Sequence, residues 1–274
     1  MTGQSGTTVL KLGGELLETP DGCRCVAMAI FRLAARSPLV VVHGGGREVD
    51  AEMAAKGIPK RAVDGLRVTD AATLDVVVEV LAGRVNTRLL AATRVAGVQS
   101  VGLTAADAGV STIQRAEPYT TAEGTVVDLG FVGQPTGTDR PVVLDQLCRA
   151  GLVPIVASIG ADGGGQLLNV NADTLAGHLA GRLGAARLLI AGGTAGVLDE
   201  QGQTIPSMDM KMMQRLITDG GASAGMVAKL IACREAHRTG VGRIDIVKGT
   251  HTDDLGTSPG TTISCAGSEV AQAG

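Results

Sequence analysis

The sequence contains two glycine-rich segments close to lysines, a combination that can bind anions. Residues 11–14 read Lys-Leu-Gly-Gly after a short apolar run, and residues 220–225 precede a helical stretch that contains Lys229. Glycine lets backbone N–H groups approach an anion closely, and the lysine ammonium adds positive charge. A solvated surface lysine would explain either segment alone. Together the two segments suit the binding of phosphate groups.

Two other segments add polar groups in similar surroundings. Residues 43–46 read His-Gly-Gly-Gly between an apolar run and a helical stretch, where free N–H groups would meet the positive end of a helix dipole. A tight turn without a ligand is the alternative there. Residues 169–173 read Asn-Val-Asn-Ala-Asp before another helical stretch. An extended conformation would place their three polar side chains on one side, whereas helix capping by Asp173 is the structural alternative.

The elements that must position these segments alternate between strands and helices. Aliphatic runs predict strands over residues 7–12, 39–42, 100–103, 153–157, 187–190 and 243–247, the last being the final clear strand. Amphipathic stretches predict helices over residues 25–35, 47–56, 71–96 with a possible break near Gly83, 142–150, 174–183, 208–218 and 225–238. This alternation indicates a mainly parallel sheet, in which ligands bind outside the carboxyl ends of the strands.

Residues 113–139 differ from the rest of the chain. They are polar and rich in threonine and glycine, with two short apolar pairs at residues 126–127 and 131–132. Short runs separated by turn residues are typical of β-hairpins. We expect hairpins here, which could form a flap over a site.

Composition and charge exclude several classes of protein. The chain contains no Trp, one Tyr and two Phe, and its formal net charge is −3, so base stacking and clustered positive charge for nucleic acid are both lacking. The five cysteines form no CxxC pair, which argues against a disulfide framework or a zinc site and favours free thiols. Without a signal-peptide core or an apolar run of about 20 residues, we expect no membrane partner and a cytoplasmic location.

In their order and spacing, these segments resemble the amino-acid kinase family, and within it the members that act on N-acetyl-L-glutamate. The most specific parts are residues 65–69 (Gly-Leu-Arg-Val-Thr) together with residues 169–173, and further matches lie at residues 11–14, 43–46, 81–86, 158–160 and 225–229. The resemblance implies an α/β fold, an open three-layer αβα sandwich with a mainly parallel central sheet. Residues 1–183 would form an N-terminal lobe for the amino acid, and residues 184–274 a C-terminal lobe for the nucleotide.

The activity implied is ATP-dependent phosphorylation of the side-chain carboxylate of N-acetyl-L-glutamate, a step of arginine biosynthesis, with Mg²⁺ bridging the ATP phosphates. An ionised carboxylate is already a nucleophile, so catalysis needs positioning and charge stabilisation rather than a general base. By the same resemblance, Lys11 and Lys229 would stabilise the transferred phosphoryl group, and Asp173 would hold both lysines. The nucleotide would contact Gly13, Gly193, Thr194, Gly196, Gly221, Ala222 and Ser223.

The amino-acid substrate has its own implied contacts. Gly45 and Gly46 would donate N–H groups to the phosphoryl group or the substrate, and Arg67 would bind the α-carboxylate, for which a fork-shaped guanidinium is suited. Asn169 would hydrogen-bond the acetylated end. No protein residue is implied as a metal ligand.

Two departures from the family pattern affect the nucleotide site and the assembly. Residues 192–194 (Gly-Gly-Thr) stand where the family usually has an acidic residue, so an acidic contact near the nucleotide is missing, and residues 248–262 are shorter than usual. Arginine-inhibited members carry an extra N-terminal helix that builds a hexamer. Only residues 1–7 precede the first predicted strand, so we expect a homodimer without strong arginine feedback.

Three other functions compete with this one. A kinase acting on carrier-bound aminoadipate would depart from both the HGGG and the NVNAD segments. A non-catalytic amino-acid sensor on the same fold is favoured by residues 192–193 but opposed by the retained lysine pair and Asp173, since two lysines held near one anion site are costly unless they are used. A dinucleotide-dependent oxidoreductase would need a G-x-G-x-x-G fingerprint, which does not follow the first strand, and Walker A and protein-kinase signatures are also absent.

Overall fold

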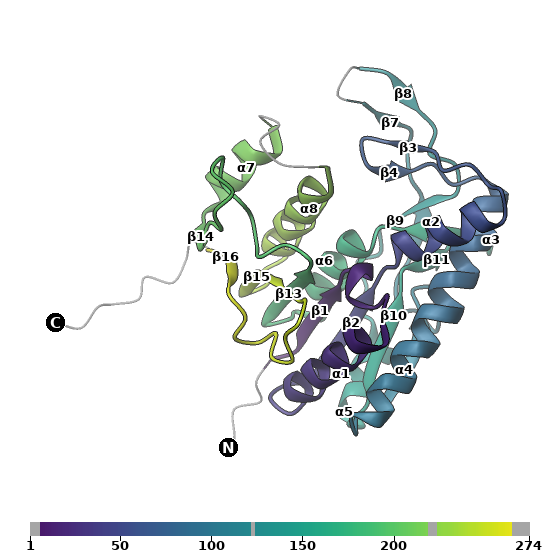
Figure 1. The fold of residues 1–274 in the computed structure, drawn as a ribbon. Coiled ribbons are helices and arrows are strands. Elements are labelled where there is room, and N and C mark those ends of the chain that lie inside the picture. The colour runs from purple at the N-terminus through teal and green to yellow at the C-terminus, as the bar shows by residue number, and fades with distance from the viewer. Residues whose placement is uncertain (1–5, 122–123, 219–223, 265–274) are drawn as a thin grey trace.

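An eight-stranded sheet runs through the computed structural model of the chain, which describes residues 6–121, 124–218 and 224–264 (Figure 1). Neighbouring strands run parallel, apart from one antiparallel pair, β15 with β16. In spatial order the strands are β14 (Ser207–Met208), β16 (Gly260–Ile263), β15 (Arg243–Lys248), β13 (Arg187–Gly192), β1 (Thr8–Leu12), β2 (Leu39–His43), β10 (Val153–Ala157) and β5 (Ser100–Thr104).

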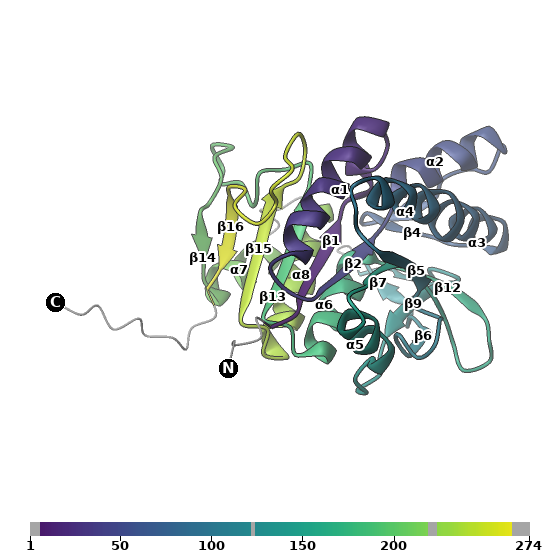
Figure 2. The same ribbon diagram turned by 90° about the horizontal axis from the view of Figure 1, so that it is seen from below.

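Helices cover both faces of this sheet and produce three layers (Figure 2). Successive strand residues point to opposite faces, so Val9 belongs to one core and Leu10 to the other. Both faces are buried, which explains why the central strands are almost continuously apolar. The Leu10 core includes α1 (Pro20–Ala34), α2 (Gly46–Ala55), α3 (Ala71–Val78) and α4 (Asn86–Val95), and the Val9 core includes α5 (Val142–Arg149), α6 (Ala172–Leu183), α7 (Met210–Thr218) and α8 (Ala224–Arg238). The predicted αβα sandwich with a mainly parallel sheet is confirmed.

A smaller four-stranded sheet and two hairpins lie beyond the carboxyl ends of the central strands (Figure 1). The small sheet has the order β11 (Ile159–Ala161), β12 (Leu167–Val170), β9 (Val132–Pro135) and β6 (Ile113–Arg115). The hairpins pair β3 (Ala62–Val63) with β4 (Leu66–Arg67), and β7 (Tyr119–Thr120) with β8 (Val126–Val127). The prediction of hairpins within residues 113–139 is therefore confirmed, and the flap stays a prediction. Tyr119 Oη donates to Asp64 Oδ2 at 3.1 Å and joins the two hairpins.

Capping residues explain why two helices begin earlier than their hydrophobic patterns predict. Helix α1 begins at Pro20 rather than near residue 25, because the Thr19 hydroxyl accepts from Gly22 N and proline suits the first helical position. Helix α6 begins at Ala172 rather than Thr174, because the Asn171 side chain accepts from the N–H groups of residues 173 and 174. The alternative that Asp173 caps this helix is therefore wrong.

Three other expectations for the elements also need correction. The possible break near Gly83 is a π-helical segment, η2 (Glu79–Val85), which continues α3 into α4 without interruption. The helix predicted over residues 208–218 begins at Met210, since Met208 lies in β14. Strand β16 follows the segment predicted as the final strand, and its Gly-Thr-Thr-Ile sequence carries too weak an apolar signal to predict a strand.

Close packing of α6 against α8 depends on two glycines. A side chain at Gly177 would lie 2.7 Å from the carbonyl oxygen of Ala232, and one at Gly181 would overlap Thr239. Glycine is needed at both positions because only hydrogen fits between the two helices. The contact fixes α6, which carries Asp173, against α8, which carries Lys229.

Within the described part of the chain, the four cysteines Cys23, Cys25, Cys148 and Cys233 are free thiols, as expected. Burial raises the pKa of Cys148 to about 11, so this half-buried thiol is protonated near neutral pH. No described helix is long and apolar enough to cross a bilayer.

Candidate active site

A cavity of about 270 Å³ opens at the carboxyl ends of β1, β2 and β10, beneath the β3–β4 hairpin. Strand β1 is the point where the strand order reverses, because the chain proceeds from β1 toward β2 on one side and later returns to β13 on the other. Such a switch point is where open α/β sheets bind ligands. The charged and amide side chains lining the cavity are Lys11, Glu15, Arg67, Asn169, Asn171 and Asp173.

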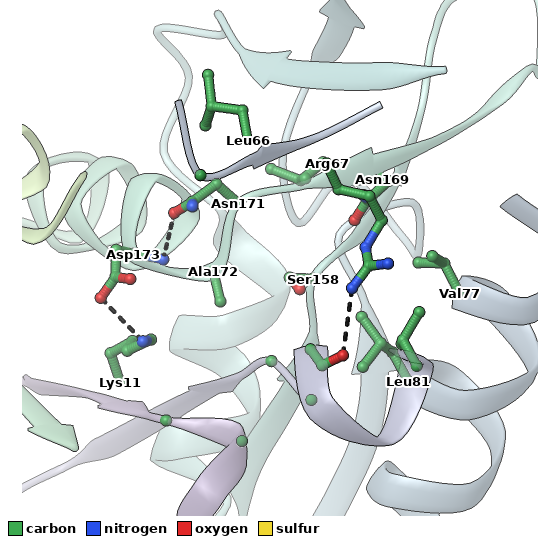
Figure 3. Close-up of a pocket in the computed structure, with 18 of the residues that line it drawn as sticks. Lys11, Leu66, Arg67, Val77, Leu81, Ser158, Asn169, Asn171, Ala172 and Asp173 are labelled. Atoms are coloured by element: carbon green, nitrogen blue, oxygen red, sulfur yellow. Dashed lines mark hydrogen bonds and ion pairs between the residues drawn. The ribbon is translucent and has the colours of Figure 1, made fainter. Parts of the chain in front are cut away.

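Lys11 and Asp173 form a buried ion pair on one side of the cavity. Lys11 Nζ lies 2.9 Å from Asp173 Oδ1, and the two residues are 5% and 6% exposed (Figure 3). Lysine is rarely buried unless it is paired, and breaking such a pair leaves an uncompensated charge. A buried pair at a cavity wall is a candidate for function.

The Asn169–Asp173 segment reaches this cavity by a different route from the extended one predicted. Asn169 lies in β12, Asn171 caps α6, and Asp173 lies inside the first turn of that helix. All three nevertheless line the cavity, because the strand-to-helix corner turns there. The Asn169 amide nitrogen donates to Thr69 Oγ1 at 3.1 Å, so Thr69 orients it.

Two glycine loops touch each other at the cavity floor. A side chain at Gly14 would lie 2.6 Å from the Cα atom of Gly45, and one at Gly45 would lie 2.7 Å from Leu81. Glycine at these positions therefore lets the β1 loop and the β2 loop approach each other. Gly45 and Gly46 line the cavity, as the sequence predicts for residues that contact the substrate.

His43 anchors the β2 loop from below. It is fully buried, its Nδ1 lies 3.1 Å from Gly44 O, and Asn86 Nδ2 lies 3.0 Å from its Nε2. Since the Asn86 amide donates to Nε2, the Nδ1 hydrogen donates to the Gly44 carbonyl oxygen. Burial lowers the pKa of His43 to about 4, so the ring is neutral near neutral pH. His43 is thus a positioning residue, and it does not line the cavity.

Arg67 lies across the cavity from Lys11 and is held by groups that sequence reasoning missed (Figure 3). Its Nη2 donates to Asp50 Oδ1 and to Gly46 O, the latter at 3.2 Å. Lys60 Nζ donates to the other oxygen of Asp50 at 2.8 Å. Burial would raise the pKa of Asp50, but the hydrogen bonds from Lys60 and Arg67 outweigh it and lower that pKa. Asp50 gives no signal in the sequence because it looks like any exposed helix residue.

Lys229 does not line the described cavity. Its Nζ donates to Gly225 O at 3.4 Å, and its Cε lies 3.9 Å from where a side chain at Gly192 would begin. Lys229 therefore lies at the carboxyl end of β13, next to the strand that carries Lys11. Among the described residues, Lys229 makes no ion pair with Asp173, so a shared role for Asp173 stays a prediction.

Glu15 is a second residue that sequence reasoning missed. It follows the β1 glycines in the 3₁₀ turn η1 (Gly14–Leu16), and its Oε1 accepts from Gly193 N at 2.7 Å. A side chain at Gly13 would lie 2.5 Å from both carboxylate oxygens. The turn after β1 thus supplies an acidic group next to residues 192–194, which contain none.

The residues predicted to contact the nucleotide do not all lie in the cavity. Gly13 lines the cavity, and Gly193 and Thr194 are exposed at the end of β13. Gly196 has a φ of 116°, and a side chain there would lie 2.6 Å from Thr261 Oγ1. The backbone conformation and packing therefore require glycine at this position. Gly221, Ala222 and Ser223 lie outside the described residues.

Known proteins similar to this chain indicate which family it belongs to. The amino acid kinase family matches residues 6–248. The chain belongs to the amino acid kinase family. An acetylglutamate kinase of Gluconacetobacter diazotrophicus is 40% identical over 248 residues, covering 89% of this chain and 79% of that protein. One from Acidiphilium cryptum is 44% identical over 250 residues, covering 89% and 83%.

Solved structures of other proteins share the fold of this chain. N-acetylglutamate synthase from Neisseria gonorrhoeae, complexed with coenzyme A and N-acetyl-glutamate, superposes with a TM-score of 0.81 at 25% identity. The match covers 95% of this chain but only 60% of the synthase, so this chain spans about three fifths of that protein's length. Carbamate kinase from Giardia has a TM-score of 0.67 at 16% identity, covering 94% of this chain and 98% of that one, which shows the fold alone.

Proposed function

We propose that this amino acid kinase transfers the γ-phosphoryl group of ATP to the side-chain carboxylate of N-acetyl-L-glutamate, giving an acyl phosphate in arginine biosynthesis. The observation that supports this best is the cavity itself, with a buried Lys11 beside two glycine loops and Arg67 on the opposite side. A dicarboxylate would span these two cations. The relatives named acetylglutamate kinase, about 40% identical over 89% of the chain, support the same substrate.

The proposed chemistry uses charge and position. Arg67 would bind the α-carboxylate, and the N–H groups of Gly45 and Gly46 would face the reacting carboxylate. Lys11 and Lys229 approach from neighbouring strand ends and would stabilise negative charge on the transferred phosphoryl group, with Asp173 holding Lys11 in place. Fixed cations and N–H donors that match the transition state lower the barrier without reorganising.

Mg²⁺ fits the oxygen donors present, although they do not form a complete cage. The carboxylates lining the cavity belong to Glu15 and Asp173, and no group of three His, Cys, Asp or Glu residues occurs in the described part of the chain. Mg²⁺ commonly takes one or two carboxylates plus substrate phosphates. We propose that ATP phosphates supply most ligands and that Glu15 is the protein oxygen available beside the phosphate loops. When bound, the ion would neutralise phosphate charge.

We also propose the arrangement of the two substrates along the chain. Residues 1–183 would bind the amino acid and residues 184–274 the nucleotide. Arg67 and Asn169 in the first segment and the β13 loop in the second support this division.

The test is ATP turnover with hydroxylamine trapping of the acyl phosphate. The chain is offered N-acetylglutamate, glutamate, aspartate or aminoadipate, and hydroxamate is expected from N-acetylglutamate alone. Lys229→Ala is expected to lower kcat by about 10²–10³-fold, since it removes a cation that acts on the transition state. Lys211→Ala, at an exposed position on α7, is the matched control. A folded chain that yields no hydroxamate from any of these substrates would favour a non-catalytic sensor.

A further inference from the structure

Ser158 has a hydroxyl with no partner inside the proposed substrate cavity. The residue is 2% exposed and lines the cavity, yet no described residue hydrogen-bonds its Oγ. Because the hydroxyl faces the open space of the cavity, water or a ligand must supply its hydrogen-bond partner. In Figure 3 its oxygen lies between Ala172 and the Arg67 guanidinium, facing the open space.

The sheet register fixes where this hydroxyl lies. His43 pairs with Leu12 on one side and with Ala157 on the other, so the next residues on the three strands are Gly13, Gly44 and Ser158 at one level. Neighbouring strands are about 4.8 Å apart. Ser158 therefore lies one strand beyond the β2 glycine loop, on the side away from β13.

The backbone around Ser158 is rigid. The residue joins β10 of the large sheet to β11 of the small sheet, and its carbonyl oxygen accepts from Val170 N at 3.0 Å. A hydroxyl held on such a junction is oriented before a ligand arrives, which reduces the entropy lost on binding.

We propose that Ser158 is a substrate-binding residue whose hydroxyl donates a hydrogen bond to an oxygen of the bound acylated amino acid, either a carboxylate oxygen or the acyl oxygen. This inference rests on the proposed function. Lys11 and Arg67 supply charge on either side of the cavity, and Ser158 supplies a neutral donor between them. The acceptor would be an sp² oxygen of the substrate. Without substrate, water would accept the hydrogen bond from Ser158.

The Ser158→Ala variant separates this role from a structural one. A structural serine would lose stability on substitution, whereas removing an unpartnered hydroxyl leaves the thermal midpoint of the ligand-free chain unchanged or raises it. The dissociation constant for N-acetylglutamate, measured by calorimetry without nucleotide, is expected to rise about five- to tenfold, as for one lost hydrogen bond. Ser111→Ala is the matched control, since Ser111 Oγ also has no partner but is buried outside the cavity lining.

Succinate and N-acetylglutamate as probes locate the acceptor oxygen. Equal losses of affinity for both in Ser158→Ala assign the bond to a carboxylate, and a loss for N-acetylglutamate alone assigns it to the acyl oxygen. Equal dissociation constants in the unsubstituted chain and the variant overturn the inference and leave the proposed function standing. An unsubstituted chain that binds no N-acetylglutamate overturns both.

Discussion

At the scale of single residues, each charged side chain at the site has its own hydrogen-bond or ion-pair partner. Asp173 pairs with Lys11, Asp50 holds Arg67, and Glu15 accepts from Gly193 N. A cation with a fixed partner keeps its position when the ligand is absent, so less ordering is required on binding. His43 contributes differently, since it is neutral and orients the β2 loop through the Gly44 carbonyl oxygen.

Stability should depend on the protonation of His43. Its pKa of about 4 in the folded chain lies below its ordinary value of 6.5, so between these pH values the unfolded chain binds a proton that the folded chain does not. The free energy of unfolding should therefore fall as pH drops from 6.5 toward 4, by up to roughly 3 kcal/mol from this group. Denaturant titrations across this range measure it.

The control is His43→Gln, which keeps a hydrogen-bonding side chain but does not titrate. Other groups also change charge in acid, so the informative quantity is the difference in slope between the two proteins. If the two proteins lose stability in parallel below pH 6.5, His43 is not the group responsible.

At the scale of elements, the site is built where several segments meet. The end of β1, the loops after β1, β2 and β10, strands β4 and β12, and the first turn of α6 line its cavity. Helix α8, which carries Lys229, packs against α6, and Gly177 of α6 allows the two helices to approach closely. Their spacing therefore sets the separation of Asp173 from Lys229.

Gly177→Ala should weaken both folding and catalysis. The new methyl group would lie 2.7 Å from Ala232 O, so one helix must move. Overpacking of this kind typically costs about 1–3 kcal/mol. We expect a lower thermal midpoint and a lower kcat with a smaller change in the KM for N-acetylglutamate, because the proposed role of Lys229 is to stabilise the transferred group.

Gly83→Ala provides the comparison, because a side chain there meets nothing within 4 Å. It should leave kcat and the thermal midpoint nearly unchanged. A kcat of Gly177→Ala that equals the unsubstituted value would show that the α6–α8 distance does not position Lys229.

Glu15 links the β1 and β13 loops, and its charge should oppose nucleotide phosphates. Gln at this position keeps an acceptor for Gly193 N and removes the negative charge. Without Mg²⁺, Glu15→Gln should bind ATP about three- to tenfold more tightly, as expected for about 1 kcal/mol of repulsion. Glu15→Ala should bind less tightly than Glu15→Gln, since the loops lose their link.

Calorimetry with and without Mg²⁺ tests both statements. Mg²⁺ should reduce the advantage of Glu15→Gln, because a carboxylate can bind the ion. Weaker ATP binding by Glu15→Gln in the absence of Mg²⁺ would show instead that the carboxylate supports the nucleotide directly.

At the scale of the whole molecule, one continuous sheet carries both proposed lobes. Strand β1 pairs with β2 on one side and β13 on the other, so the two substrates would meet across a single strand. The boundary between residues 183 and 184 falls between α6 and β13 and cuts no element. The two-lobe assignment stays a prediction.

The homodimer is a prediction that belongs to this scale. Strand β5 is an edge of the large sheet and pairs only with β10 among the described residues. Exposed edges favour pairing or coverage by another chain. Sedimentation equilibrium should give twice the chain mass of 27.6 kDa. A monomer or a hexamer at micromolar concentration would contradict this.

The sequence by itself determined the fold class and the glycine-rich strand ends at which the cavity forms. Aliphatic runs followed by glycine predicted strands with their carboxyl ends at one edge, and Lys11, Gly45 and Asp173 line one cavity there. Local patterns suffice for this because burial on two faces and glycine at strand ends are local requirements. Arg67 lines the same cavity, but only the family resemblance had pointed to it.

Only the tertiary structure decided which groups become partners. Glu15 reaches Gly193 across 178 positions of sequence, Asp50 reaches Arg67 from another element, and Ser158 lies level with Gly44 through strand register. Strand β16 and the start of α6 were likewise set by pairing and capping rather than by apolar pattern. Contacts between distant segments depend on how elements pack, and a polar residue carries no local signal of the partner it will meet.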